Sequence, residues 1–257
     1  MSFIRRIGHD TLELLANIGE FSIFVYHGIV GALSRNFFWK ELWRQCLELG
    51  FFSLPIVGLT AIFAGMVLAL QTYTGFARFS GESAVATVVL ISITRELGPV
   101  LSGLMVAGRM SSSIAAELGA MRISEQIDAL ETMNVSPYRY LIAPRLLAGL
   151  ITLPILVFIA DILGVFGGYI VGITKLGFSS YAYIYQTVTN IETMDIVCGL
   201  VKAIAFGFSI AAFGCFYGFR CKKGAKGVGE ATTNAVVFAC ILILVFNYLL
   251  TALFFGL

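Results

Sequence analysis

Two opposite charges lie side by side in a stretch of this sequence that is otherwise apolar. Arg95 and Glu96 have apolar residues on both sides and are followed by Gly98-Pro99, a pair that weakens a helix. An ionisable group at membrane depth costs roughly 3 kcal/mol or more and is usually retained for a function. Successive side chains leave a helix about 100° apart, so these two groups do not satisfy only each other. Lys202, in a later apolar segment, is the obvious partner for Glu96.

The chemistry open to such a cluster is the binding of a charged group. We predict that Arg95, Glu96 and Lys202 line a cavity that contacts a charged headgroup. The alternative is an ion pair that only fixes the packing of helices. Asp161, in another apolar segment, is ambiguous, and we leave it out of the predicted site.

The sequence contains none of the common catalytic motifs. It has no phosphate-binding GxxxxGK[ST] loop, no HExxH and no GxSxG. Its two histidines and five cysteines lack the spacing of metal ligands, so we predict no metal site. We therefore expect a chain that is not an enzyme and does not hydrolyse ATP itself.

The composition predicts an all-α integral membrane protein. Hydrophobic residues make up 58% of the 257 residues and charged residues only 12%, against about 25% charged in soluble domains. The mean hydropathy is +0.91. The net charge of +2 gives no indication of nucleic-acid binding. Five segments reach the roughly 20 residues that a membrane span requires; they are residues 49–77, 83–118, 146–174, 196–219 and 231–257. The second would be roughly 54 Å long as one helix, so we expect it to kink at Gly98-Pro99, to extend beyond the membrane, or both.

The first 48 residues differ from the rest, and we divide the chain into residues 1–48 and residues 49–257. Trp39 and Trp43 lie one helical turn apart beside Lys40 and Arg44, a combination that favours the headgroup layer. We predict one or two interfacial elbow helices there, followed by a five-helix transmembrane domain. The alternative is a sixth, short span over residues 21–33.

Lysine and arginine predict the orientation of the chain. The segment before the first span and the loops after the second and fourth spans carry most of these residues. The remaining loops carry only Arg78 and Lys175. The positive-inside rule then places the N-terminus in the cytoplasm and the C-terminus outside.

The loop after the second span contains a short amphipathic helix, predicted at about residues 123–134. Ser124 is a suitable cap at its N-terminus, and Pro137 follows its end. One face would hold four apolar residues, namely Ile123, Ile127, Leu130 and Met133. The other would hold three acidic residues, namely Glu125, Asp128 and Glu131. We expect this helix to lie across the cytoplasmic end of the bundle and to dock a partner; the alternative is a solvated connecting helix.

An ordered set of motifs resembles the MlaE/YrbE permease family. The set consists of Arg95-Glu96-Leu97-Gly98-Pro99-Val100, Ala107-Gly108-Arg109, Ala116-Glu117-Leu118-Gly119, Met121-Arg122, Glu125-Gln126, Ser136-Pro137 and Pro144-Arg145. The upstream run Gly65-Met66-Val67-Leu68-Ala69-Leu70-Gln71 and the later run Ala231-Thr232-Thr233 are also similar to that family. The resemblance covers nearly the whole chain from about residue 45.

The resemblance implies the permease subunit of an ABC transporter that moves phospholipid between the inner and outer membranes of a Gram-negative bacterium. It implies a homodimer in the inner membrane, joined by a cytoplasmic ATPase, a small STAS-domain protein and a periplasmic ring of MCE-domain subunits. ATP and Mg would bind the ATPase, and this chain would carry no cofactor. The lipid cavity of the family maps onto Leu68, Phe76, Phe79, Arg95, Glu96 and Lys202. The coupling helix of the family maps onto the amphipathic helix, where Glu125, Asp128, Leu130 and Glu131 would meet the ATPase.

Two other functions compete with this interpretation. An ion-coupled secondary transporter would use Glu96 as a protonation site, but it would leave the acidic helix without a purpose, and the five spans show no inverted repeat. A structural scaffold for other membrane subunits would leave the intramembrane charges without a purpose.

Overall fold

Helices account for the architecture of the part of the chain that the computed structural model describes, which is residues 2–33, 38–76 and 84–256. No strand occurs in those three ranges. Five helical stretches are long and apolar enough to cross a membrane; they are Trp39–Phe76, Val85–Ile123, Tyr138–Thr174, Thr193–Phe219 and Ala225–Phe255. The predicted all-α class with five spans is confirmed.

The helix that contains the first span extends beyond the apolar segment that hydropathy predicts. The amphipathic helix α2 (Trp39–Gly50) continues through a short 3-10 turn, η1 (Phe51–Ser53), into the apolar helix α3 (Leu54–Phe76). Gly50 keeps a right-handed helical conformation, so the chain does not break between the polar and apolar parts. This continuous helix therefore begins at Trp39, ten residues before the predicted start of the span at residue 49.

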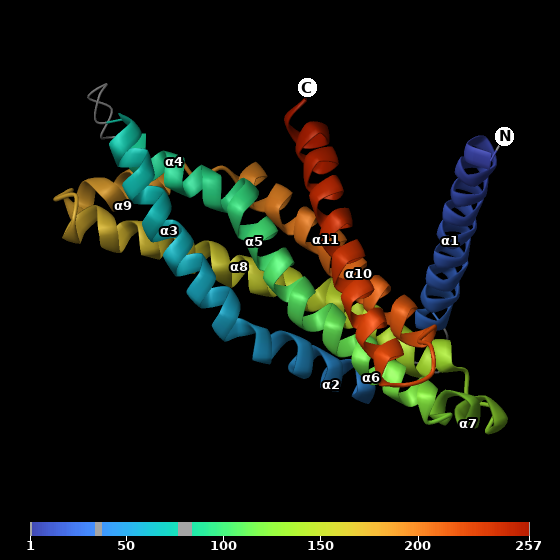
Figure 1. Cartoon of the computed structure of the whole chain (residues 1–257). Helices are drawn as coiled ribbons and strands as arrows, with labels where there is room; N and C mark the ends of the chain where they lie inside the picture. The colour runs from blue at the N-terminus through green and yellow to red at the C-terminus, as the bar shows by residue number, and fades with distance from the viewer. Residues whose placement is uncertain (1, 34–37, 77–83, 257) are drawn as a thin grey trace.

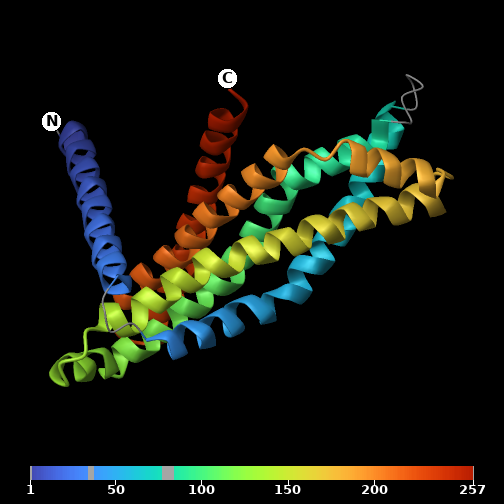
Figure 2. The same ribbon diagram turned by 180° about the vertical axis from the view of Figure 1, so that it is seen from behind.

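Helix α1 (Ser2–Ala32) stands away from the bundle and meets it only near its C-terminal end (Figures 1 and 2). Phe21 stacks on Phe213 there, with ring centroids 4.5 Å apart, and Phe24 meets Phe216 edge-on. Helix α1 is not among the five candidate spans, so the structure does not support the sixth span over residues 21–33.

The second span is built from five consecutive elements. Three are α-helices, namely α4 (Val85–Ser92), α5 (Gly98–Val106) and α6 (Ser112–Ile123), and two are wider π-helical turns between them, namely η4 (Ile93–Leu97) and η5 (Ala107–Ser111). The first π turn ends directly before Gly98-Pro99, where the sequence predicts a kink. Such turns rotate the side chains of a helix and are frequent at functional sites.

The remaining spans pack closely around this irregular one. The third consists of η6 (Tyr138–Ile142) and α8 (Ala143–Thr174), the fourth is α10 (Thr193–Phe219), and the fifth is α11 (Ala225–Phe255). A Cβ atom on Gly65 of α3 would lie 1.9 Å from the carbonyl oxygen of Gly164 in α8, and one on Gly207 of α10 would lie 2.2 Å from that of Gly149. Because only glycine permits such contacts, the three helices approach each other backbone to backbone.

Two short helices mark the opposite ends of the bundle (Figure 1). Helix α7 (Gln126–Thr132) lies at the end where α6 stops, and α9 (Ser180–Thr189) lies at the other end beside α4. On the predicted orientation, the α7 end is cytoplasmic.

Candidate functional site

A buried lysine joins the second and fourth spans. The ammonium of Lys202 in α10 donates to Glu96 Oε1 at 2.8 Å and to the backbone oxygen of Arg95, also at 2.8 Å. The side chain of Lys202 is fully buried, whereas that of Glu96 is 38% exposed. The predicted pairing of Glu96 with Lys202 is confirmed.

The backbone explains why the lysine donates to a carbonyl as well as to a carboxylate. Pro99 has no N–H, so the carbonyl four residues earlier, that of Arg95, loses its usual helical donor. Lys202 supplies a donor in its place. Gly199, one turn before Lys202, allows the approach, since a Cβ there would lie 2.6 Å from the carbonyl oxygen of Thr94. The Gly98-Pro99 pair therefore creates the acceptor that positions the lysine.

The last span completes the environment of Glu96. Asn247 Nδ2 donates to Oε2 at 2.8 Å. The Thr251 hydroxyl shares its proton between Oε1 at 2.9 Å and the Asn247 carbonyl at 2.8 Å. Both side chains come from α11, so the carboxylate connects the second, fourth and fifth spans. Sequence reasoning missed Asn247 and Thr251, although two polar residues four apart in an otherwise apolar span are a detectable signal.

Arg95 turns away from Glu96 and forms a second ion pair. Its Nε lies 2.5 Å from Oδ1 of the buried Asp195, and its guanidinium lies 4.3 Å from the centre of the Phe255 ring. Glu192 is more distant, at 3.9 Å. The predicted trio is therefore part of a cluster of four residues that also includes Asp195. The cluster consists of two ion pairs, Arg95–Asp195 and Glu96–Lys202, and Lys202 links them by donating to the Arg95 carbonyl. Arg95 is 28% exposed, so the cluster is accessible on one side.

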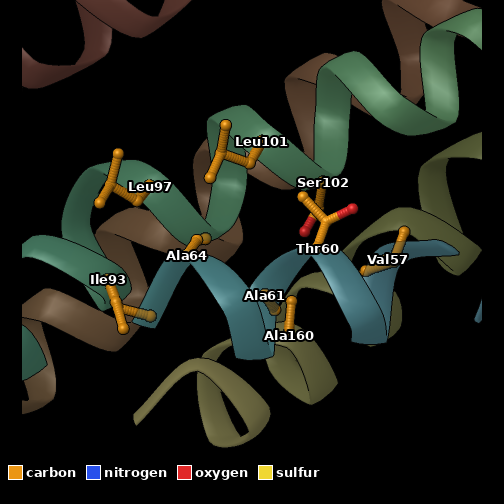
Figure 3. A pocket seen from close by; sticks show the side chains of 10 residues that line it. Val57, Thr60, Ala61, Ala64, Ile93, Leu97, Leu101, Ser102 and Ala160 are labelled. Atoms are coloured by element: carbon orange, nitrogen blue, oxygen red, sulfur yellow. The ribbon is translucent and has the colours of Figure 1, made fainter. Parts of the chain in front are cut away.

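The small hollow beside this turn is too small for a lipid chain. It lies between α3 and α5, and its walls include Ala64, Leu97 and Leu101 (Figure 3). Its volume of about 10 Å³ is close to the space of a single water molecule. Asp161 is packed nearby against Gly98, and its buried Oδ1 has no hydrogen-bond partner in the described part of the structure.

Two of the three apolar residues of the predicted site lie in the described part of the chain. Leu68 is partly buried and packs on a small cluster that includes Ile93, near the first π turn. Phe76 is the last residue of α3 and is 37% exposed. Phe79 lies outside the described residues.

The predicted coupling helix is shorter than residues 123–134. Ser124 does not cap it; its hydroxyl donates back to the Ala120 carbonyl at 2.8 Å and closes α6. Glu125 then takes a left-handed conformation, with φ of 59°, so the chain turns before α7 begins at Gln126. The two helices are separate because the serine satisfies the end of the first rather than the start of the second.

The two faces of α7 differ as the pattern predicts, with one exception. Ile127 is buried and Leu130 packs partly against the core, but Met133 is 72% exposed. The acidic residues Glu125, Asp128 and Glu131 are all exposed. Asp128 pairs with Arg122 at 2.5 Å. An acidic surface is therefore presented at this end of the bundle.

Comparisons with known proteins cover almost the whole chain. The family model described as Permease MlaE matches residues 42–253. A "Probable ABC transporter permease protein" of Rickettsia bellii is 51% identical over 99% of this chain and 98% of that protein. The "Intermembrane phospholipid transport system permease protein MlaE" of Haemophilus influenzae is 34% identical over 100% of this chain and 98% of that protein.

Proposed function

The chain belongs to the MlaE permease family, and from this premise we propose that it is the membrane subunit of an ATP-driven transporter that moves phospholipid between the inner and outer membranes. Permeases of ABC transporters are non-enzymatic subunits, and the five apolar helices make this one a multi-pass inner-membrane protein. In our proposal, a separate cytoplasmic ATPase binds ATP and Mg and hydrolyses the nucleotide.

The observation that carries the proposal is the charged cluster of Arg95, Glu96, Lys202 and Asp195. Four ionisable groups inside membrane-spanning helices are costly, and packing alone does not require them. Lys202 is buried, but Arg95 and Glu96 keep about a third of their surface accessible. We propose that a lipid phosphate binds at this accessible side, with Arg95 as its donor.

We place the lipid chamber between two copies of the chain. Helix α11 contributes Asn247 and Thr251 to the cluster, yet only 11% of its most apolar stretch is buried in the single chain. A second copy covering this apolar face would enclose the cluster from the open side. Leu68, Phe76 and Phe79 would then contribute apolar contacts for the acyl chains.

Transport would follow from a change in the shape of this chamber. In our proposal, the exposed acidic face of α7 docks the ATPase through Glu125, Asp128, Leu130 and Glu131. ATP-dependent closure of the ATPase would move α6 and the π turns of the second span. The site would then bind lipid more weakly in one state than in the other, which is the condition for directed release. A STAS-domain subunit and a periplasmic MCE-domain ring complete the proposed assembly.

The proposal is tested by phospholipid transfer from proteoliposomes that contain the complex. Transfer should require ATP, and Glu96→Gln should slow it while the complex still assembles. A gradient-driven transfer without ATP would indicate the ion-coupled transporter instead. Normal transfer by a stable Glu96→Gln complex would show that the cluster is only a packing device.

A further inference from the structure

A second polar cavity lies at the α7 end of the bundle, apart from the Glu96 cluster. It has a volume of about 320 Å³ and opens between α2 and the second π turn, η5. Its polar walls come from Gln45 and Glu48 of α2, Arg109 of η5, and Ser113 and Glu117 of α6. This volume is at the lower end of the range for ligand sites and is far larger than the hollow between α3 and α5.

Arg109 is an uncompensated cation on this cavity. It donates to Ser53 Oγ at 2.7 Å and lies 5.7 Å from the centre of the Phe52 ring. No carboxylate of the described residues lies within ion-pair distance of Arg109, although four other arginines at this end of the bundle have such partners. The Ser53 hydroxyl donates its own proton to the Leu49 carbonyl. Its oxygen is therefore the acceptor for Arg109 and holds the guanidinium in place. The remaining N–H groups are available to an anion.

The carboxylates on the same cavity are only partly satisfied. Glu117 Oε1 accepts from Arg145 at 2.9 Å and lies 3.9 Å from Arg44, and Glu48 Oε1 lies 3.6 Å from the same Arg44. Both glutamates keep substantial exposure, 50% for Glu48 and 39% for Glu117. The cavity therefore offers one free cation and, on its other walls, two acceptor groups, a pattern complementary to a zwitterion.

The depth of the cavity matches the headgroup layer. Helix α3 begins at Leu54, one residue after Ser53, and its 23 residues span roughly 34 Å, about the thickness of the hydrocarbon core. Trp39 and Trp43 on the preceding helix are exposed, as residues at a membrane interface are. Phe52 and Ile56 present an exposed apolar track from the cavity mouth toward the membrane interior.

We propose that this cavity binds the headgroup of a zwitterionic phospholipid from the leaflet at the α7 end. The phosphodiester would lie on Arg109, the ammonium toward Glu48 and Glu117, and the acyl chains along Phe52 and Ile56. Arginine suits this task because its planar N–H groups match a phosphate. The inference depends on the proposed function only for the class of lipid, and it adds a docking site distinct from the central chamber.

The test is photocrosslinking in nanodiscs that contain equal amounts of phosphatidylethanolamine and phosphatidylglycerol. A benzophenone amino acid replaces Ser113, which lines the cavity and is exposed. Mass spectrometry then identifies the lipid attached to the full-length protein in its complex. We expect mainly the phosphatidylethanolamine adduct, and about tenfold less of it in Arg109→Gln, because a hydrogen-bonded charge is removed. The matched control Lys223→Gln removes an exposed cation at the same end and should leave the yield unchanged.

Further variants separate the possible outcomes. Glu48→Gln should lower the preference for phosphatidylethanolamine over phosphatidylglycerol, even if Arg109→Gln does not fold. Competition by inorganic phosphate would overturn the proposal in favour of a free anion. Equal adducts with both lipids, or none, would also overturn it. Glu96→Gln should not change the adduct, because Glu96 does not line this cavity. ATP-driven transfer without an adduct would refute this site alone. An adduct without ATP-driven transfer would refute the proposed function alone.

Discussion

Replacing Lys202 by methionine removes one of two ion pairs that connect the second and fourth spans, and leaves the Arg95–Asp195 pair in place. Methionine has a similar length and no charge, so it fills the buried position without a large cavity. Two contacts are lost, one to Glu96 Oε1 and one to the carbonyl of Arg95. The Arg95 carbonyl then loses the donor that stands in for the missing N–H of Pro99.

The size of the effect follows from the exposure of the partners. Breaking a fully buried pair costs about 3–5 kcal/mol. Glu96 is more than a third exposed and keeps its donors Asn247 and Thr251, so water and these donors reduce that cost. The orphaned carbonyl adds about 1–3 kcal/mol. If the exposed side of Glu96 reduces the cost of the pair to about 1–2 kcal/mol, Lys202→Met should lower the free energy of unfolding by about 2–5 kcal/mol.

A double-mutant cycle isolates the interaction between the two side chains. Glu96→Gln alone leaves the buried Lys202 ammonium without a negative charge beside it, with only neutral oxygen acceptors, so it should also destabilise the protein. The double variant Glu96→Gln/Lys202→Met should be less destabilised than the sum of the single variants, by about 1 kcal/mol or more. Denaturant unfolding of the purified protein in detergent measures all three, with the exposed Lys223→Met as a control that should remain within about 0.5 kcal/mol of wild type.

Two results would contradict this reasoning. If Lys202→Met were as stable as the wild type, the contacts of the ammonium with Glu96 and with the Arg95 carbonyl would not contribute to stability. Strict additivity in the cycle would mean that the two charges do not interact, despite the 2.8 Å distance between them.

Three further predictions concern other parts of the molecule. Gly65→Ala should destabilise the protein by about 1–3 kcal/mol because its Cβ would meet the Gly164 carbonyl, whereas Gly75→Ala, with nothing within 4 Å, should not; thermal unfolding in detergent compares the two. The double variant Glu125→Lys/Glu131→Lys should release the ATPase from the purified complex. The unfolding temperature should not change, because both side chains are exposed. An unchanged yield of ATPase would exclude α7 as its docking surface. Asn247→Ala and Thr251→Ala should each lower the free energy of unfolding by about 1–2 kcal/mol, since each removes one donor from Glu96. Both should also reduce the lipid retained on the complex, measured by mass spectrometry, and unaltered retention in both would argue against a lipid site there.

The sequence by itself determined the class of fold, the five spans and the pairing of Glu96 with Lys202. A spanning helix satisfies its backbone internally, so its existence depends on local hydropathy and length. Few charges occur within the spans, and this scarcity restricted the choice of partner for Glu96. The acidic face of the helix after the second span followed from the 3.6-residue period for the same local reason.

Only the tertiary structure decided how these helices are rotated and shifted against one another. That relative placement turned Arg95 toward Asp195 instead of the site centred on Glu96, and it brought Asn247 and Thr251 from α11 to the same carboxylate. It also decided which of two hydrogen bonds a side chain makes: Ser124 donates to the last turn of α6 and does not cap the N-terminus of α7. Side chains from distant segments meet according to close backbone contacts such as Gly65 on Gly164, and no local pattern in the sequence encodes those distances.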